Sequence, residues 1–130
     1  MVIDTSILVA ILFDEPERLQ ASQAIARDPK RLVSAASLLE ASIVAEARQG
    51  EAAGRDLDLA LHRMHATIVA VDETQAELAR SAWRRFGKGN HPARLDYGDC
   101  FSYALAVSAG EPLLFKGDDF GKTDIAVVSY

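Results

Sequence analysis

Short apolar segments alternate with longer amphipathic ones along the whole chain, and this alternation limits the fold more than any other feature. The apolar runs at residues 2–3, 31–35, 67–71, 112–115 and 125–130 have the length of buried strands. Helical spacing of apolar residues, with caps and stops, predicts helices at residues 6–13, 15–28, 37–50, 54–66, 72–87 and 95–110. Strands that alternate with helices usually form a parallel sheet. The sequence therefore predicts an α/β fold with a short parallel central sheet flanked by helices on both faces.

The size and composition indicate one globular domain over residues 1–130. The chain is 49% hydrophobic and 25% charged, so it has enough apolar residues for a core. Cys100 is the only cysteine, which excludes an internal disulfide. The longest uncharged run near the N-terminus, Thr5 to Phe13, is too short to span a bilayer. We therefore expect a cytoplasmic protein without a membrane contact.

The distribution of charge bears on binding to nucleic acid. The formal net charge is −5, which argues against a protein that wraps nucleic acid through bulk charge. One segment, residues 80–94, is nevertheless basic and contains no acid. Its charged or titratable residues are Arg80, Arg84, Arg85, Lys88, His91 and Arg94. Two interpretations stay open: a solvated helix end followed by a loop, or a local patch that binds phosphates.

Acidic residues recur where the predicted strands end. Asp4 directly follows the first strand, and Asp118 and Asp119 follow the strand at residues 112–115. Glu40 and Asp99 lie in the first turns of predicted helices that should begin at the same edge. Ligands of open parallel sheets bind at the carboxyl ends of the strands. Four separated acidic positions are therefore expected to meet there.

Each of these acids also has a purely structural interpretation. Asp4 and Asp96 are suited to cap helices, and Asp99 lies three residues after Asp96. Ser37 and Glu40 have the spacing of a capping box. Taken together, however, three or four converging carboxylates repel one another unless a cation is present. Their oxygen atoms are the ligands that Mg²⁺ or Mn²⁺ prefers, and such clusters hydrolyse phosphodiesters.

Four fragments carry a resemblance to a known family. They are "MVIDTSILVAIL", "SAASLLEASIV", "YGDCFSYALA" and "PLLFKGDDF", in this order. In order and spacing they resemble a PIN domain and, more narrowly, the VapC toxins of bacterial VapBC toxin–antitoxin pairs. The resemblance extends from Met1 to Tyr130.

This resemblance implies a Mg²⁺-dependent endoribonuclease that a cognate antitoxin silences, with Mn²⁺ as a substitute metal. It implies that Asp4 and Asp99 are the principal metal ligands. Glu40 completes the site, either as a ligand through water or by positioning the attacking water. The hydroxyl of Thr5 or Ser6 is expected to orient a ligand or a metal-bound water.

The loop "KGDDF" departs from the family pattern. Many PIN domains have Thr and then Asn or Asp before a final Asp-Phe pair, whereas this chain has Phe115, Lys116 and Gly117 there. Asp119, directly before Phe120, is favoured over Asp118 as the fourth, catalytic acid. Lys116 is either a phosphate contact or an ordinary surface lysine.

The resemblance also predicts partners. We expect a VapB-like antitoxin that wraps the early helices and inserts a basic or aromatic side chain into the acidic pocket. An apolar face with Leu8, Ile11, Leu12 and Phe13 is either its contact surface or only core. The RNA substrate is a tRNA, rRNA or mRNA, and the chain is expected to form a homodimer.

Two other functions compete with the nuclease. A phosphoacceptor receiver domain is imitated by Asp4, Asp72 and Lys116, but it needs an acidic pair after the first strand, where this chain has Thr5 and Ser6. It also leaves Glu40 and Asp99 without a role. A non-catalytic PIN-like module that binds RNA or protein is the second alternative, although the expected acids are present.

Overall fold

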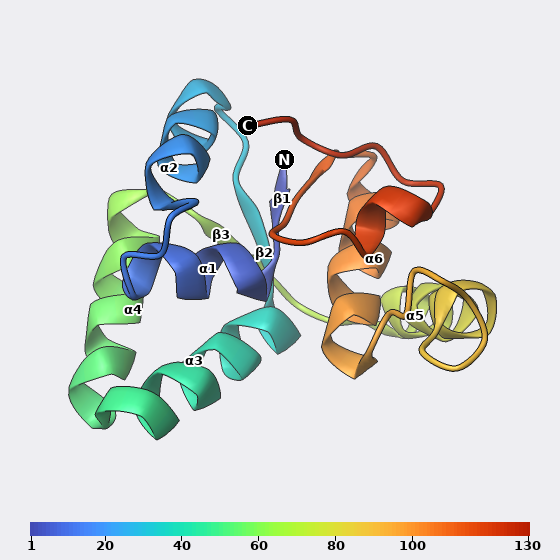
Figure 1. The fold of residues 1–130 in the computed structure, drawn as a ribbon, viewed down its shortest axis with the longest axis horizontal. Helices are drawn as coiled ribbons and strands as arrows, with labels where there is room; N and C mark the ends of the chain where they lie inside the picture. Colours follow the sequence, from blue (N-terminus) through green and yellow to red (C-terminus); the bar gives the residue numbers. More distant parts are fainter.

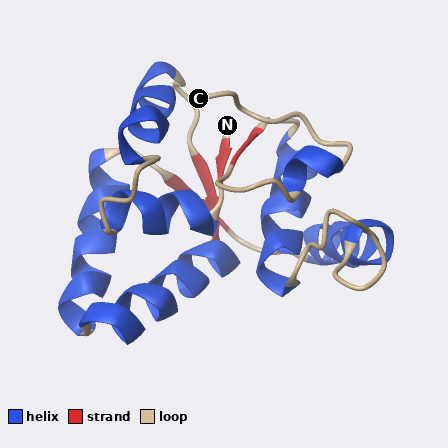
Figure 2. Cartoon of the chain, in the orientation of Figure 1, coloured by secondary structure: helices blue, strands red, loops and turns tan.

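The computed structural model describes all residues from 1 to 130, and a small sheet lies at its centre. Strands β1 (Val2–Ile3), β2 (Leu32–Ser34), β3 (Thr67–Val69) and β4 (Leu113–Leu114) form one sheet in the order β3-β2-β1-β4 (Figure 2). All three strand pairs are parallel, and Val2 lies opposite both Leu32 and Leu113. Because β1 is an inner strand, the residue that follows it, Asp4, lies near the middle of the carboxyl edge.

Helices cover both faces of the sheet. Helices α1 (Thr5–Leu12), α2 (Arg18–Arg27), α3 (Ala35–Gln49) and α4 (Glu51–Arg63) lie on one side (Figure 1). Helices α5 (Glu73–Phe86) and α6 (Tyr97–Ala109) lie on the other, and a short 3₁₀ helix, η1 (Phe120–Lys122), follows β4. The predicted α/β architecture with a parallel sheet between two helical layers is confirmed.

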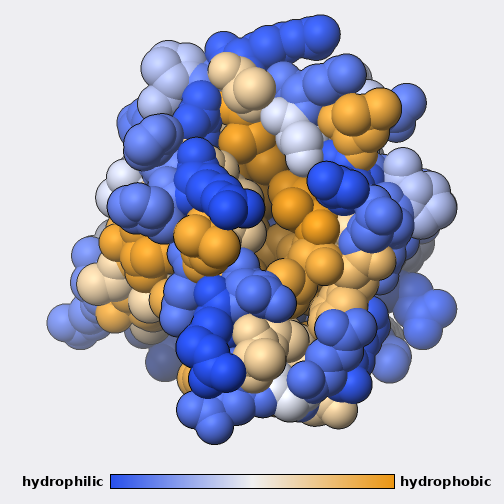
Figure 3. All heavy atoms as spheres, turned by 90° about the vertical axis from the view of Figure 1, so that its left-hand side faces the viewer, coloured by the Kyte–Doolittle hydropathy of each residue, from blue (hydrophilic) through white to orange (hydrophobic).

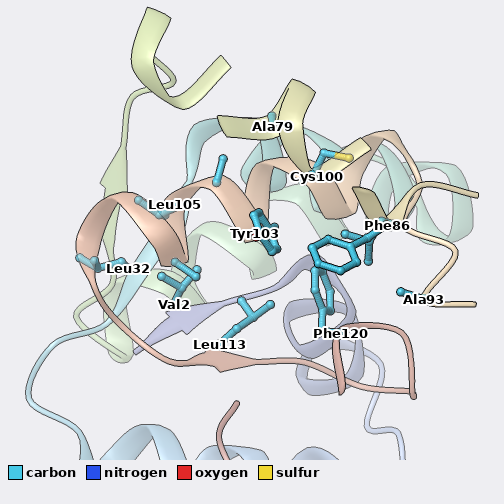
Figure 4. Close-up of a cluster of buried hydrophobic side chains, with 14 residues drawn as sticks. Val2, Leu32, Ala79, Phe86, Ala93, Cys100, Tyr103, Leu105, Leu113 and Phe120 are labelled. Atoms are coloured by element: carbon cyan, nitrogen blue, oxygen red, sulfur yellow. The ribbon is translucent and has the colours of Figure 1, made fainter. Parts of the chain in front are cut away.

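Two apolar clusters fill the space between the sheet and its two helical layers. Neighbouring residues of a strand face opposite sides of the sheet, so Val2 packs in one cluster and Ile3 in the other. In the cluster under α5 and α6, Val2 and Leu113 lie against Tyr103 and Leu105 of α6 (Figure 4). The two clusters together fix the sheet edge against helices from both layers.

The helix ends account for several acidic and hydroxyl residues. Asp4, Asp72 and Asp96 are the N-caps of α1, α5 and α6, and each side chain accepts a backbone N–H of its helix. Of the two interpretations of Ser37 and Glu40, the capping box is excluded. Ser34 caps α3 instead, and its hydroxyl accepts the N–H of Ala36. Helix α3 thus begins two residues before the predicted start, and Glu40 lies in its second turn.

The predicted strand at residues 125–130 is also wrong. Only a single parallel bridge, between Leu113 and Val127, joins this segment to the sheet. Leu113 donates its N–H to Ala126 and accepts from Val128, both at 2.9 Å. Strand β4 has only two residues, so it offers too little backbone for a longer ladder.

None of the helices is long and apolar enough to cross a membrane.

Candidate active site

Asp4 is held rigidly at the carboxyl end of β1. Its side chain is 4% exposed. Oδ2 accepts hydrogen bonds from the backbone N–H and the hydroxyl of Ser6, at 2.9 and 2.6 Å. Oδ1 accepts a hydrogen bond of 2.6 Å from the hydroxyl of Ser102. Three donors therefore fix the carboxylate of Asp4. Of the two hydroxyl residues considered from the sequence, Thr5 and Ser6, it is Ser6 that binds the Asp4 carboxylate.

Ser102 links Asp4 to two helices. It belongs to α6, is fully buried, and lies 3.2 Å from the hydroxyl of Ser37 in α3. Because Ser102 already donates its proton to a carboxylate, Ser37 is the donor in the second bond. The chain of hydroxyls thus ties β1, α3 and α6 together behind the site. In Figure 1, α1, α3 and α6 all begin near the lower end of the sheet.

Asp99 lies in the first turn of α6 and makes the capping interaction that its spacing from Asp96 indicated. Its Oδ2 accepts the N–H of Asp96 at 2.8 Å, and its own N–H binds Oδ1 of Asp96 at 2.9 Å. These two bonds form a complete capping box at the start of α6. Burial raises the pKa of Asp99 to about 7, with the hydrogen bond from Asp96 lowering it and the charges of Asp4 and Asp96 raising it further.

Glu40 approaches the same point from α3. Burial raises its pKa, the neighbouring Thr5 hydroxyl lowers it, and the charges of Asp4 and Asp96 raise it further. Its carboxylate lies against the backbone of Gly98 in α6. A Cβ atom at residue 98 would collide with Oε2 of Glu40 and lie 2.7 Å from its Cδ. Any larger residue at this position would therefore force the Glu40 carboxylate to move from its place against α6.

Asp119 reaches the site from the loop after β4. It is exposed and lines a hollow of about 280 Å³ together with Lys88, Arg94, Asp96 and Asp99. Asp118 is exposed and does not line this hollow. Asp119 is therefore the acid of the "GDD" sequence that lies beside Asp99.

Lys116 does not face this hollow as a free cation. Its ammonium group binds the carboxylates of Glu15 and Glu17, at 2.7 and 3.1 Å. Its backbone N–H donates to the hydroxyl of Ser6 at 2.9 Å. Lys116 thus supports the Asp4 side of the site through its backbone, and its charge is neutralised by the two glutamates.

The donor chemistry fits a hard divalent cation. Several carboxylates lie at this edge of the sheet, and the charge of Asp4 raises the pKa of both Asp99 and Glu40, so a cation would relieve their mutual repulsion. The side chains do not form a closed ligand set, since no three Asp, Glu, His or Cys side chains converge on one point at metal-binding distances. The arrangement is an open acidic site.

The sequence profile of the PIN domain matches residues 1–126 of this chain. The chain belongs to the PIN-domain family. Within it the chain belongs to the VapC ribonuclease toxins. It is 60% identical to Ribonuclease VapC of Mycolicibacterium smegmatis, over 98% of this chain and 99% of the relative. It is 57% identical to Ribonuclease VapC30 of Mycobacterium tuberculosis, over 99% and 98% of the two chains.

Solved structures of a VapC toxin and of a toxin–antitoxin complex share the fold. The crystal structure of VapC20 from Mycobacterium tuberculosis, described as a sarcin-ricin loop cleaving toxin, has a TM-score of 0.78 at 21% identity and covers 98% of this chain and 97% of that one. A toxin–antitoxin complex from Klebsiella pneumoniae has a TM-score of 0.76 at 20% identity and covers 99% and 97% of the two chains. Membership of the PIN family excludes the receiver domain, and the resemblance seen in the sequence is confirmed.

Sequence reasoning missed two residues of this PIN site. Ser102 and Gly98 both lie in the predicted helix at residues 95–110, and the local pattern assigns neither of them a role. Both lie in the fragment "YGDCFS", where Gly98 precedes Asp99 and Ser102 follows it by less than one turn. A buried serine on an otherwise apolar face was the only available signal, because its partner, Asp4, is 98 residues away.

Proposed function

We propose that this VapC-family chain is a Mg²⁺-dependent endoribonuclease, with Mn²⁺ as a substitute, and that it acts as the toxin of a toxin–antitoxin pair. One observation carries the proposal. Acids from four distant segments, Asp4, Glu40, Asp99 and Asp119, approach one edge of the sheet, and the charge of Asp4 raises the pKa of both Asp99 and Glu40. Such repulsion is costly in a protein that binds no cation.

Asp4 and Asp99 are the proposed metal ligands. Asp4 is buried and bonded by three donors, so its position is set before any ion arrives. Asp99 is fixed by the capping box at the start of α6. A bound Mg²⁺ would neutralise phosphate charge, lower the pKa of a water molecule and stabilise the leaving oxygen.

Glu40 and Asp119 are the proposed catalytic acids. The raised pKa of Glu40 suits a group that accepts the proton of the attacking water and later returns it. Asp119 is exposed and lines the hollow that contains Asp99, where it can orient that water or a metal ligand. Attack on phosphorus breaks one phosphorus–oxygen bond of the RNA backbone, and the leaving oxygen takes up a proton.

The test is cleavage of total cellular RNA by the purified protein and by Asp99→Asn, each with Mg²⁺ and with EDTA. Asn keeps the oxygen that accepts the Asp96 N–H, so the capping box survives while the charge is lost. We expect discrete fragments only from the wild-type protein with Mg²⁺. Equal cleavage by both proteins would assign the activity to a contaminant. Binding of RNA without cleavage by either would favour the non-catalytic module.

A groove between α1, α2 and α4 supports the proposed antitoxin contact. A hollow of about 590 Å³ lies between α1, α2 and α4 and includes Ile11, Leu12 and Met64. Figure 3 shows apolar side chains exposed in a hollow on the side of the molecule that faces left in Figure 1. Leu8 is only 1% exposed and belongs to the core, so the contact surface narrows to the outer residues of α1.

The antitoxin proposal is tested by substitution of Ser22, a half-buried residue of α2 in this groove. Ser22→Arg should weaken the complex with the VapB-like antitoxin by filling the groove. The neighbouring exposed residue of the same helix, Gln23, lies outside the groove, so Gln23→Arg should leave the complex unchanged.

We further propose that two copies associate through α3. Leu39 and Ile43 are 62% and 60% exposed and lie one turn apart on that helix. Ile43→Lys should convert a homodimer to a monomer in light scattering of the purified protein. A monomeric wild-type protein at the same concentration would refute this proposal.

A further inference from the structure

Ion pairing divides the basic segment at residues 80–94 into two groups. Arg80 pairs with Glu77 at 3.4 Å, and Arg85 pairs with Asp124 at 2.6 Å. These two arginines are neutralised within the chain. Arg84, Lys88 and Arg94 take part in none of the ion pairs of the protein. Only these three cations of the segment therefore remain free for an anion from outside.

The loop that carries Lys88 and Arg94 is well fixed. A parallel bridge joins Gly87 to Leu95, and the N–H of Lys88 donates to the carbonyl of Leu95 at 2.9 Å. Ala93 and Leu95 are fully buried. Arg94 has a φ of 54°, a left-handed conformation that non-glycine residues seldom adopt unless their surroundings impose it. The two cations thus project from a loop whose ends are bonded together.

Lys88 and Arg94 line the hollow that contains Asp96, Asp99 and Asp119. They also line a second hollow of about 500 Å³ on the outer side of the same loop. Although cations and carboxylates share the first hollow, none of them lies within ion-pair distance of another. The two cations and the three carboxylates therefore line one hollow without forming ion pairs with one another.

We propose that Lys88 and Arg94 bind a backbone phosphate of single-stranded RNA, adjacent to the phosphate that is cleaved. This inference rests on the proposed function. An acidic site on a chain of net charge −5 repels RNA, and two unpaired cations at its rim offset that repulsion locally. The planar guanidinium group of Arg94 suits two phosphate oxygens at once, and Lys88 adds a point charge. RNA that enters along these two cations is held across the carboxylates.

A simpler role for the two cations is to balance the nearby carboxylates without touching RNA. The two roles predict different effects when Lys88 or Arg94 is replaced by an uncharged residue. If the cations only balance charge, their loss alters metal binding and leaves the affinity for RNA without metal unchanged. If they bind phosphate, their loss weakens RNA binding even in EDTA, and the dependence on salt becomes less steep.

The first measurement is therefore binding of a fluorescein-labelled single-stranded oligoribonucleotide of mixed sequence, in EDTA, over a range of KCl concentrations. The variants are Lys88→Gln and Arg94→Gln, which remove the charge but keep a polar side chain, and the matched control is Arg84→Gln. Arg84 is exposed and unpaired in the same segment but does not line the hollow. We expect each test variant to bind about tenfold more weakly, which is about 1.4 kcal/mol, and Arg84→Gln to bind like the wild type. Each lost contact should reduce the slope of log affinity against log salt by about 0.7.

The second measurement is cleavage of the same RNA with Mg²⁺. Both test variants should raise KM with little change in kcat, because the carboxylates remain in place. Unchanged binding in EDTA, or an equal loss in Arg84→Gln, would overturn the phosphate site. A wild-type protein that binds but never cleaves would refute the proposed function instead, while the binding data would still decide this inference.

Discussion

The two walls of the acidic site are built differently. On the inner wall, Asp4 is buried after a central strand, and hydroxyls from α1 and α6 bind both of its oxygens. On the outer wall, Asp119 is exposed on the loop after β4, and Lys88 and Arg94 project from another loop. The inner wall is set by the core, whereas the outer wall lies on surface loops. In the proposed function, the inner wall would hold the metal and the outer wall would contact the substrate.

The largest effect is expected from the inner wall. Asp4→Asn should lower the rate of RNA cleavage about a thousandfold, because a metal ligand contributes several kcal/mol to the stability of the transition state. Multiple-turnover kinetics with Mg²⁺ would measure this loss. Residual activity within tenfold of the wild type would show that Asp4 is not a principal ligand.

Removal of the hydroxyl behind Asp4 should have the next largest effect. Ser102→Ala should lower cleavage about 10–100-fold, as is usual for residues that orient a metal ligand. It should also lower the free energy of unfolding by about 1–2 kcal/mol, since Asp4 loses a buried hydrogen bond. Ser102→Thr, which keeps the hydroxyl, should recover activity if its methyl group is accommodated. Ser42→Ala is the matched control, because the Ser42 hydroxyl binds only the backbone of its own helix.

The outer wall should tolerate more change. Asp119→Asn should lower kcat about tenfold, whereas Asp118→Asn should stay within about twofold, because only Asp119 lines the hollow. Parallel kinetics of the two variants would test the comparison directly, since both residues are exposed neighbours of the same charge. A larger loss of kcat in Asp118→Asn than in Asp119→Asn would show that Asp118 is the catalytic acid of this loop.

The smallest effect is expected on the free energy of unfolding in the absence of metal, when Asp99 is replaced by Asn. The folded pKa of Asp99, about 7, lies above its ordinary value of 3.8, so the folded state binds the proton more tightly than the unfolded state. The stability that Asp99 contributes is therefore present at low pH and is lost as the pH rises towards 7. Asp99→Asn does not titrate, so it should be more stable than the wild type by about 1 kcal/mol at pH 8 in EDTA.

Urea unfolding at pH 5 and pH 8 would measure this difference. We expect the advantage of Asp99→Asn to be smaller at pH 5, where the wild-type carboxyl is largely protonated when folded. Addition of Mg²⁺ at pH 8 should stabilise only the wild type, because the variant lacks the charged ligand. An advantage that is the same at both pH values would show that charge repulsion at Asp99 is not its cause.

Local pattern was sufficient to predict several elements correctly. Asp96 caps α6, and the apolar residues that follow it pack in the core, as the sequence indicated. The prediction failed at Ser37 and Glu40, where a capping-box spacing occurs inside α3. It also failed at residues 125–130, where an apolar run suggested a strand that β4 is too short to pair with. At the first position the nearby Ser34 provides the cap, and at the second the length of a distant strand sets the limit.

The sequence by itself determined the alternation of strands and helices, the four acidic positions and the family, because these depend on residue type and order. The tertiary structure alone decided how the acids are supported. Ser102 reaches Asp4 across 98 residues, Gly98 leaves room for Glu40, and Asp119 rather than Asp118 lies beside Asp99. It also decided which cations of the basic segment stay free, since Asp124, the partner of Arg85, lies far along the chain. Such contacts follow from the packing of distant segments, which no local pattern of residues records.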